Sequence, residues 1–134
     1  MELSFIIIDD SELDCFIARK IVAQADKSLA VKTFQNAQDV IKIIERNTQD
    51  SNNGTTIILL DLQMPLMNGF EFVEEFEKLP SGIKDKYMIV ILSSTRNSND
   101  ISRILTYSSV HSLIEKPITR EKLLSLILQG KTGF

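Results

Sequence analysis

Five short runs of aliphatic and β-branched residues recur along this chain, and segments with the apolar spacing of helices separate them. The runs span residues 3–8, 29–34, 56–60, 87–92 and 112–114. The first, third and fourth are apolar almost throughout, which is typical of central parallel strands covered on both faces. The second alternates and the fifth is short, as edge strands often are. This alternation of strand and helix predicts an α/β fold, a doubly wound three-layer sandwich with a five-stranded parallel sheet and five helices.

The helical segments have apolar residues at spacings of three and four, which places those residues on one buried face. The face predicted for the first helix consists of Leu13, Phe16, Ile17 and Ile21. The last helix carries Leu123, Leu124, Ile127 and Leu128. The sequences at 52–54 and 79–82 have the composition of turns and are too short to join two domains. Residues 1–134 are therefore expected to form one domain.

Right-handed crossovers between parallel strands restrict the strand order, and the flavodoxin-like order 2-1-3-4-5 satisfies them. In this order the ends of the first and third strands lie side by side at the switch point, where ligands of such sheets bind. Asp9 and Asp10 follow the first run, and Asp61 follows the third. We therefore expect these three carboxylates to meet in one acidic pocket.

Three carboxylates that lie close together repel one another, so at least one would stay protonated unless a cation is bound. Mg²⁺ prefers carboxylate and carbonyl oxygens, and the sequence has no histidine or cysteine cluster that would suit zinc. Ser93 ends the fourth run, and Lys116 follows the fifth. A hydroxyl, an ammonium group and a metal ion around Asp61 would stabilise a phosphoryl group, with the Asp61 carboxylate as the nucleophile.

Composition excludes several classes of protein. The 134 residues carry a formal net charge of −3, and without a basic surplus direct binding to nucleic acid is not expected. The longest apolar runs are too short to cross a membrane, and the amino terminus has no signal-peptide pattern. The one cysteine, Cys15, cannot form an internal disulfide. These features predict a cytoplasmic protein with neither nucleic acid nor a membrane as a direct partner.

In four motifs the chain resembles the receiver domains of the response-regulator family. The motifs are Ile8-Asp9-Asp10, Leu60-Asp61-Leu62-Gln63-Met64-Pro65 with Met67-Asn68-Gly69, Ile91-Leu92-Ser93-Ser94, and Lys116-Pro117. They occur in the family's order and at its spacing over nearly the whole chain. The resemblance implies a phospho-accepting receiver domain of a two-component phosphorelay, which is a signalling switch rather than an enzyme.

The resemblance also implies roles for individual residues. Asp61 would accept a phosphoryl group from a histidine kinase or a phosphotransfer protein. Mg²⁺ would be ligated by Asp10, by Asp61 and by the backbone carbonyl of Gln63, while Asp9 would act mainly through water. Lys116 would pair with the phosphoryl group, and its bond to the following proline would be cis.

Three further positions receive roles by the same resemblance. Ser93 would hydrogen-bond the phosphoryl oxygens and move inward on phosphorylation. Gly69 would permit the turn into the third helix. Gln63 and Thr95 flank the path of the attacking water and would tune the lifetime of the phosphoryl group.

One position departs from the family pattern and keeps two alternatives open. The switch position three residues before Lys116 is usually aromatic and is Leu113 here, so the usual coupled motion of a hydroxyl and a ring cannot be carried over. One alternative is a phosphate-independent adaptor that keeps the fold. The other is a small Mg²⁺-dependent phosphohydrolase, although such an enzyme would need a general acid where Gln63 stands.

Phosphorylation is expected to change the affinity of one face for a downstream protein. That face would be formed by the helix near residues 101–105, the strand at 112–114 and the last helix. The sequence ends at Phe134, soon after the last helix, so no output domain is expected unless the chain is a fragment. The surplus of apolar residues on the last helix could also support a weak dimer.

Overall fold

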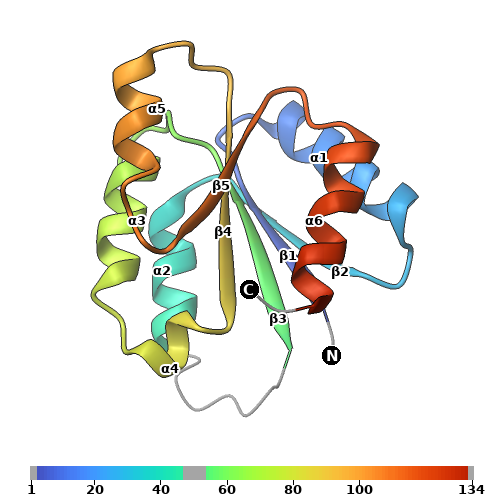
Figure 1. Ribbon diagram of the computed structural model, residues 1–134, viewed down its shortest axis with the longest axis horizontal. Coiled ribbons are helices and arrows are strands. Elements are labelled where there is room, and N and C mark those ends of the chain that lie inside the picture. Colours follow the sequence, from blue (N-terminus) through green and yellow to red (C-terminus); the bar gives the residue numbers. More distant parts are fainter. Residues whose placement is uncertain (1–2, 47–53, 133–134) are drawn as a thin grey trace.

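The computed structural model describes residues 3–46 and 54–132, and Figure 1 shows how their helices and strands are arranged. The strands are β1 (Leu3–Ile8), β2 (Ala30–Phe34), β3 (Thr55–Leu60), β4 (Tyr87–Ser93) and β5 (Val110–Glu115). The helices are α1 (Glu12–Ala25), α2 (Ala37–Arg46), α3 (Gly69–Glu77), α4 (Ser81–Lys84), α5 (Ser98–Ile104) and α6 (Arg120–Thr132). The turn predicted at 52–54 lies outside the described residues except for Gly54.

The five strands form one parallel sheet in the order β2-β1-β3-β4-β5, which confirms the predicted topology. β1 and β3 are neighbours, with Ile8 opposite Leu60 at their carboxyl ends. β2 and β5 form the two edges, as the alternation of the second run indicated. β5 is longer than its apolar run because an edge strand can continue through exposed residues such as Glu115.

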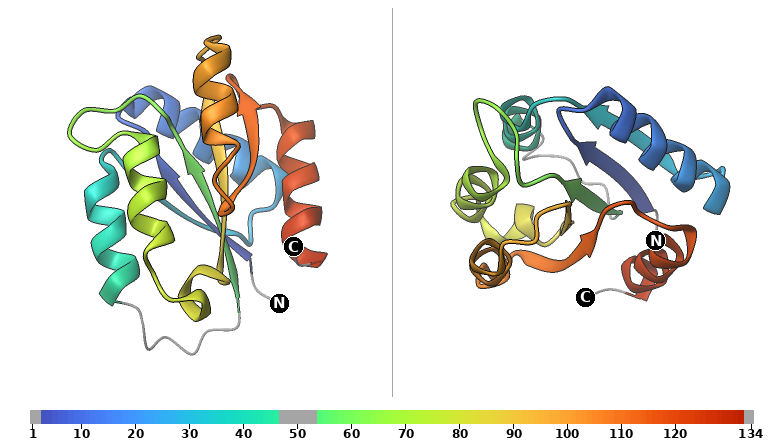
Figure 2. Two further views of the ribbon diagram at one scale, coloured as in Figure 1. Left: turned by 60° about the vertical axis from the view of Figure 1, so that its left-hand side comes forward. Right: turned by 90° about the horizontal axis from the view of Figure 1, so that it is seen from above.

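Helices cover both faces of the sheet and complete the three-layer sandwich. Figure 1 shows α1 and α6 on one face and α2, α3 and α5 on the other, and the right-hand view in Figure 2 shows the layers from above. Successive side chains of a strand point to opposite faces. In β1, Phe5 and Ile7 therefore pack in the core beneath α1 and α6, while Ile8 packs in the core beneath α2 and α3.

The described residues form one short helix more than the five that the sequence predicted. α4 is a single turn that follows Pro80 in the segment predicted to be a turn. The carbonyl of Pro80 accepts hydrogen bonds from the backbone N–H groups of Ile83 and Lys84, at 3.0 and 3.1 Å. A four-residue helix is too short to carry an apolar period, so the spacing rule could not detect it.

The buried face predicted for α1 is right at Ile21, which packs against the core beneath α1 and α6, and wrong at the other three positions. The residues that α1 buries against the sheet are Cys15, Ala18 and Val22. Leu13 and Phe16 are 65% and 57% exposed. The spacing rule fails at these positions because it assigned the larger apolar residues to the buried face, whereas α1 buries smaller ones. Among the described residues, none of the helices is both long and apolar enough to cross a membrane.

Candidate functional site

Three carboxylates converge at the carboxyl edge of the sheet, as predicted. Asp9 follows β1 and Asp61 follows β3, and the backbone N–H of Asp61 donates to the carbonyl of Ile8 at 3.0 Å. One carboxylate oxygen from each of Asp9, Asp10 and Asp61 lies within 4.8 Å of the other two. The parallel register of β1 and β3 thus brings together residues that are 52 positions apart in sequence.

Local hydrogen bonds hold Asp9 in this cluster. Its backbone N–H donates to the carbonyl of Phe34 on β2 at 3.0 Å. Its carboxylate accepts from the backbone N–H of Ser11 at 3.0 Å, and its carbonyl accepts from the Sγ of Cys15 at 3.3 Å. Burial raises the pKa of the Cys15 thiol to about 11, so this cysteine is a packed, unreactive support for the loop.

The charge of the cluster is only partly compensated. Asp9 and Asp61 are buried, while Asp10 is exposed. Burial raises the pKa of Asp61 to about 6; the charge of Lys116 lowers it in part, and the neighbouring charge of Asp9 raises it further. Because the charged form of Asp61 is disfavoured, a cation bound beside it would stabilise the ionised carboxylate.

Lys116 supplies the positive charge inside the cluster. The Lys116-Pro117 peptide bond is cis, and the backbone N–H of Lys116 donates to the carbonyl of Ser93 at 2.9 Å. The Nζ atom lies 2.7 Å from Asp9, 2.9 Å from Asp14 and 3.7 Å from Asp61. Burial disfavours the charged ammonium, but the hydrogen bonds to Asp9 and Asp14 and the charge of Asp61 outweigh it and raise the pKa of Lys116.

Asp14 is the residue that sequence reasoning missed. It lies in the first turn of α1, where Ser11 caps the helix by accepting a hydrogen bond from the Asp14 N–H at 3.1 Å. Asp14 is an acid at the start of the first helix, four residues after Asp10, but nothing in the sequence tied it to Lys116.

Ser93 ends β4 at the same edge of the sheet and is 2% exposed. Its Oγ accepts a hydrogen bond from the backbone N–H of Thr95 at 3.0 Å. The Thr95 hydroxyl in turn accepts from the backbone N–H of Asn97 at 3.2 Å. Both hydroxyl groups therefore organise the loop from β4 into α5.

The segment after β3 brings Gln63 and Gly69 to the site. The backbone N–H of Gln63 donates to the carboxylate of Asp61 at 3.4 Å, and the Gln63 residue is exposed. A Cβ atom at Gly69 would lie 2.9 Å from both the Asp61 carbonyl oxygen and the Cα of Leu62. The glycine is thus required by the close approach of two backbone segments, which is a different reason from the turn geometry that the sequence suggested.

Leu113 stands on β5 opposite Ile91 of β4. It is half-buried and packs against the core beneath α2, α3 and α5. Tyr107 follows α5 and packs against the same core, and its hydroxyl donates to Glu74 of α3 at 2.7 Å. An aliphatic side chain thus packs at the position where the family usually has an aromatic one.

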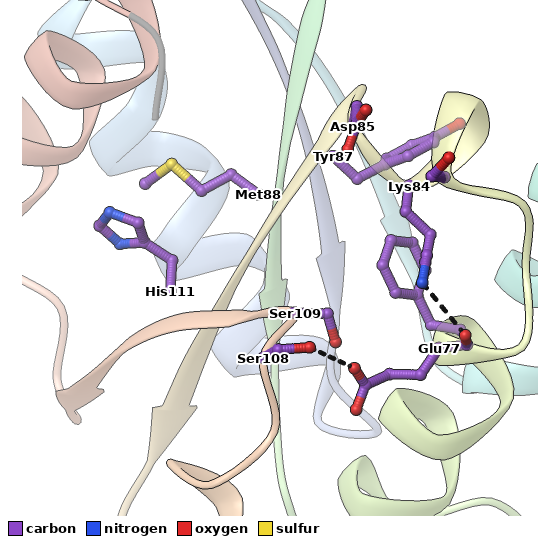
Figure 3. A pocket seen from close by; sticks show the side chains of 10 residues that line it. Glu77, Lys84, Asp85, Tyr87, Met88, Ser108, Ser109 and His111 are labelled. Atoms are coloured by element: carbon purple, nitrogen blue, oxygen red, sulfur yellow. Dashed lines mark hydrogen bonds between the residues drawn. The ribbon is translucent and has the colours of Figure 1, made fainter.

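Two hollows on the surface differ in their position relative to the acidic cluster. A hollow of about 750 Å³ lies where β4 and β5 begin, away from the acidic cluster; Figure 3 shows Lys84, Tyr87 and His111 around it. A smaller one of about 250 Å³ borders Lys116 and is lined mainly by apolar atoms of α1 and of the segment after β5. The three carboxylates of the acidic cluster suit a small cation.

Comparison with known families identifies the chain. The model of the response regulator receiver domain matches residues 5–128. The chain therefore belongs to the response regulator receiver family, as the four motifs indicated.

Curated relatives carry this domain within different proteins. A protein-glutamate methylesterase/protein-glutamine glutaminase of Treponema pallidum is 31% identical over 93 residues, which are 69% of this chain and 21% of that protein. The peroxide stress-activated histidine kinase mak1 of Schizosaccharomyces pombe is 30% identical over 118 residues, 87% of this chain and 7% of the kinase. The chain thus spans a quarter or less of each of these relatives. Two-component response regulator 24 of Arabidopsis thaliana is 27% identical, and the match covers 94% of this chain and 82% of that protein.

Solved structures agree in fold over nearly the full length. A response regulator receiver protein from Dyadobacter fermentans is 34% identical with a TM-score of 0.82, and the match covers 93% of this chain and 94% of that one. A two-component response regulator from Cytophaga hutchinsonii has a TM-score of 0.86 at 21% identity and 98% coverage of both chains, which supports the fold alone.

Proposed function

We propose that this chain is a phospho-accepting receiver of a two-component phosphorelay, and that Asp61 is the acceptor. The observation that carries the proposal is the meeting of Asp9, Asp10 and Asp61 within 4.8 Å, with the Lys116 ammonium group beside them. An Asp61 oxygen would form a bond to phosphorus as the phosphorus–nitrogen bond of a phosphohistidine breaks, and the departing imidazole would take up a proton.

The donor set fits a magnesium ion. Carboxylate oxygens of Asp10 and Asp61 and the backbone carbonyl of Gln63 would hold Mg²⁺, and Asp9 would contribute through water. Burial, and to a lesser extent the charge of Asp9, raise the pKa of Asp61 despite the charge of Lys116, and a bound cation would favour its ionised form. Bound Mg²⁺ would neutralise charge on the phosphoryl oxygens and on the cluster.

Ser93 and Lys116 are proposed to bind the phosphoryl oxygens, since both lie at the carboxyl edge beside Asp61. Movement of Ser93 would release the Thr95 N–H and reshape the loop into α5. Leu113 would repack where other receivers move a ring. Gln63 and Thr95 would tune the phosphoryl lifetime, because both are joined to the site through backbone N–H groups.

The signal is proposed to pass between proteins in the cytoplasm. A histidine kinase or a phosphotransfer protein would supply the phosphoryl group. The face formed by α5, β5 and α6 would then bind a downstream protein, and the exposed Leu124 and Leu128 of α6 could contribute to that contact or to a weak dimer.

Acetyl phosphate tests the proposal directly. Incubation of the protein with Mg²⁺ and acetyl phosphate should add the mass of one phosphoryl group, and Asp61→Asn should abolish the adduct. Intact-protein mass spectrometry is the measurement, and omission of Mg²⁺ is the control. Rapid turnover of a phosphoester without an adduct would instead indicate a hydrolase. If the protein neither binds Mg²⁺ nor forms an adduct with acetyl phosphate, it would instead be a phosphate-independent adaptor.

A further inference from the structure

The Lys116 ammonium group is shared among three carboxylates, and it lies farthest from the one that matters most to the proposed function. Its Nζ atom is within hydrogen-bonding distance of Asp9 and Asp14, at 2.7 and 2.9 Å. The distance to Asp61 is 3.7 Å, which is too long for a hydrogen bond. Two of the three N–H donors of the ammonium group are therefore engaged away from Asp61.

Asp14 differs from Asp9 in what holds it there. Asp9 belongs to the loop after β1 and is fixed by hydrogen bonds to Phe34, Ser11 and Cys15. Asp14 belongs to α1, and its side chain is 39% exposed. Removal of Asp14 would therefore leave Lys116 anchored by Asp9 while withdrawing one competing negative charge.

We propose that Asp14 competes with the phosphoryl group for the Lys116 ammonium group, and thereby weakens the hold of the site on an aspartyl phosphate. This inference rests on the proposed function. A phosphoryl group on Asp61 needs Lys116 as a donor, and a carboxylate that already binds the same ammonium group neutralises part of its charge. Asp14 is thus a positioning residue that biases Lys116 toward its unphosphorylated arrangement.

The sign of the effect depends on which contribution of Asp14 is larger. Asp14 also orients the ammonium group, and loss of that orientation would weaken binding. Asp9 also holds the ammonium group, at 2.7 Å, and Asp9 is itself only 3% exposed. Little orientation of Lys116 should therefore be lost when Asp14 is replaced. The negative charge of Asp14 is removed completely in Asp14→Asn, and its effect is reduced but not eliminated by solvent. Relief of competition should therefore exceed the loss of orientation.

Beryllofluoride, which mimics an aspartyl phosphoryl group, is the probe for this competition. In the presence of Mg²⁺, Asp14→Asn should bind beryllofluoride about three- to tenfold more tightly than the wild-type protein by isothermal titration calorimetry. Asp14→Glu should restore affinity to near the wild-type value, since it returns the charge. Glu12→Gln is the matched control, because Glu12 is an exposed acid in the same helical turn, and its affinity should remain near that of the wild type.

A readout without metal or phosphoryl mimic completes the test. In a crystal structure of metal-free Asp14→Ala, which lacks the acceptor that asparagine would keep, the Lys116 Nζ atom should move from 3.7 Å to within hydrogen-bonding distance of Asp61. Equal or weaker binding by Asp14→Asn, with adduct formation intact in the wild type, would overturn this inference and leave the proposed function standing. Failure of the wild type to bind beryllofluoride and to form an adduct on Asp61 would overturn both.

Discussion

Two effects raise the pKa of Asp61: its side chain is buried, and it lies close to other carboxylates. Its pKa rises from 3.8 to about 6, with burial as the largest cause. In the absence of a metal ion, the folded protein therefore keeps a proton on Asp61 at pH values where the unfolded chain has already released it. Folding stability should then fall as the pH rises from about 4 to about 6, and the loss should be complete above that range.

Asp61→Asn should remove this penalty. In metal-free buffer at pH 7.5, the substitution should raise the free energy of unfolding by roughly 2 kcal/mol, and at pH 4 it should have little effect. Urea denaturation at the two pH values is the measurement. Asp85→Asn, at the exposed acid that follows α4, is the control and should change neither value. An equal gain at both pH values would mean that charge on Asp61 is not the cause.

The loop that connects β3 to α3 places Gln63 beside Asp61. Asn68 caps α3 by accepting from the Glu71 N–H at 2.9 Å, and the Glu71 carboxylate accepts from the Asn68 N–H at 3.0 Å. The N–H of Gly69 donates to the carbonyl of Leu62 at 2.9 Å. The start of α3 is thus fastened to the residue that follows Asp61.

Gly69→Ala should therefore be destabilising. Its methyl group would lie 2.9 Å from backbone atoms of Asp61 and Leu62, which cannot move aside as a flexible side chain could. The expected cost is roughly 1–3 kcal/mol, measured by urea denaturation.

Gly82→Ala is the matched control for this substitution. No atom lies within 4 Å of a Cβ placed at Gly82 in α4. Alanine there should be neutral or stabilising by up to about 1 kcal/mol, since it reduces the entropy of the unfolded chain. Similar costs at the two glycines would mean that close approach at Gly69 is not the reason for its presence.

At the scale of the whole molecule, a bound cation should stabilise the folded state, because its ligands come from strands that are far apart in sequence. The acids come from the ends of β1 and β3, and Lys116 comes from beyond β5. A cation that binds the acids only when folding has brought the ends of β1 and β3 together stabilises the entire fold by mass action. The thermal midpoint should consequently rise with Mg²⁺ concentration.

Asp10→Ala should abolish that rise. Asp10 is exposed, so its removal costs no packing, and the loss of a like charge beside Asp9 and Asp61 should leave the metal-free midpoint unchanged or higher. Differential scanning fluorimetry over a Mg²⁺ titration, with and without the substitution, is the measurement. A persistent Mg²⁺ dependence in Asp10→Ala would place the ion elsewhere.

Sequence patterns predicted much of this architecture because they reflect local rules. Continuous apolar runs mark buried parallel strands, and residues that directly follow such strands must share one edge of the sheet. The convergence of Asp9 and Asp61 needed only those two rules and the strand order. The same rules missed α4, which is too short to have a period, and misassigned Leu13 and Phe16.

The sequence by itself determined the family, the strand order and the meeting of the acids, since each depends on residue type and order along the chain. Only the tertiary structure decided that α1 turns its small residues to the sheet, and that Lys116 binds Asp14 across 102 positions of sequence. Both outcomes depend on how closely α1 packs and on where its first turn lies relative to the end of β5. Such distances are set by the packing of all three layers at once, and no local pattern encodes them.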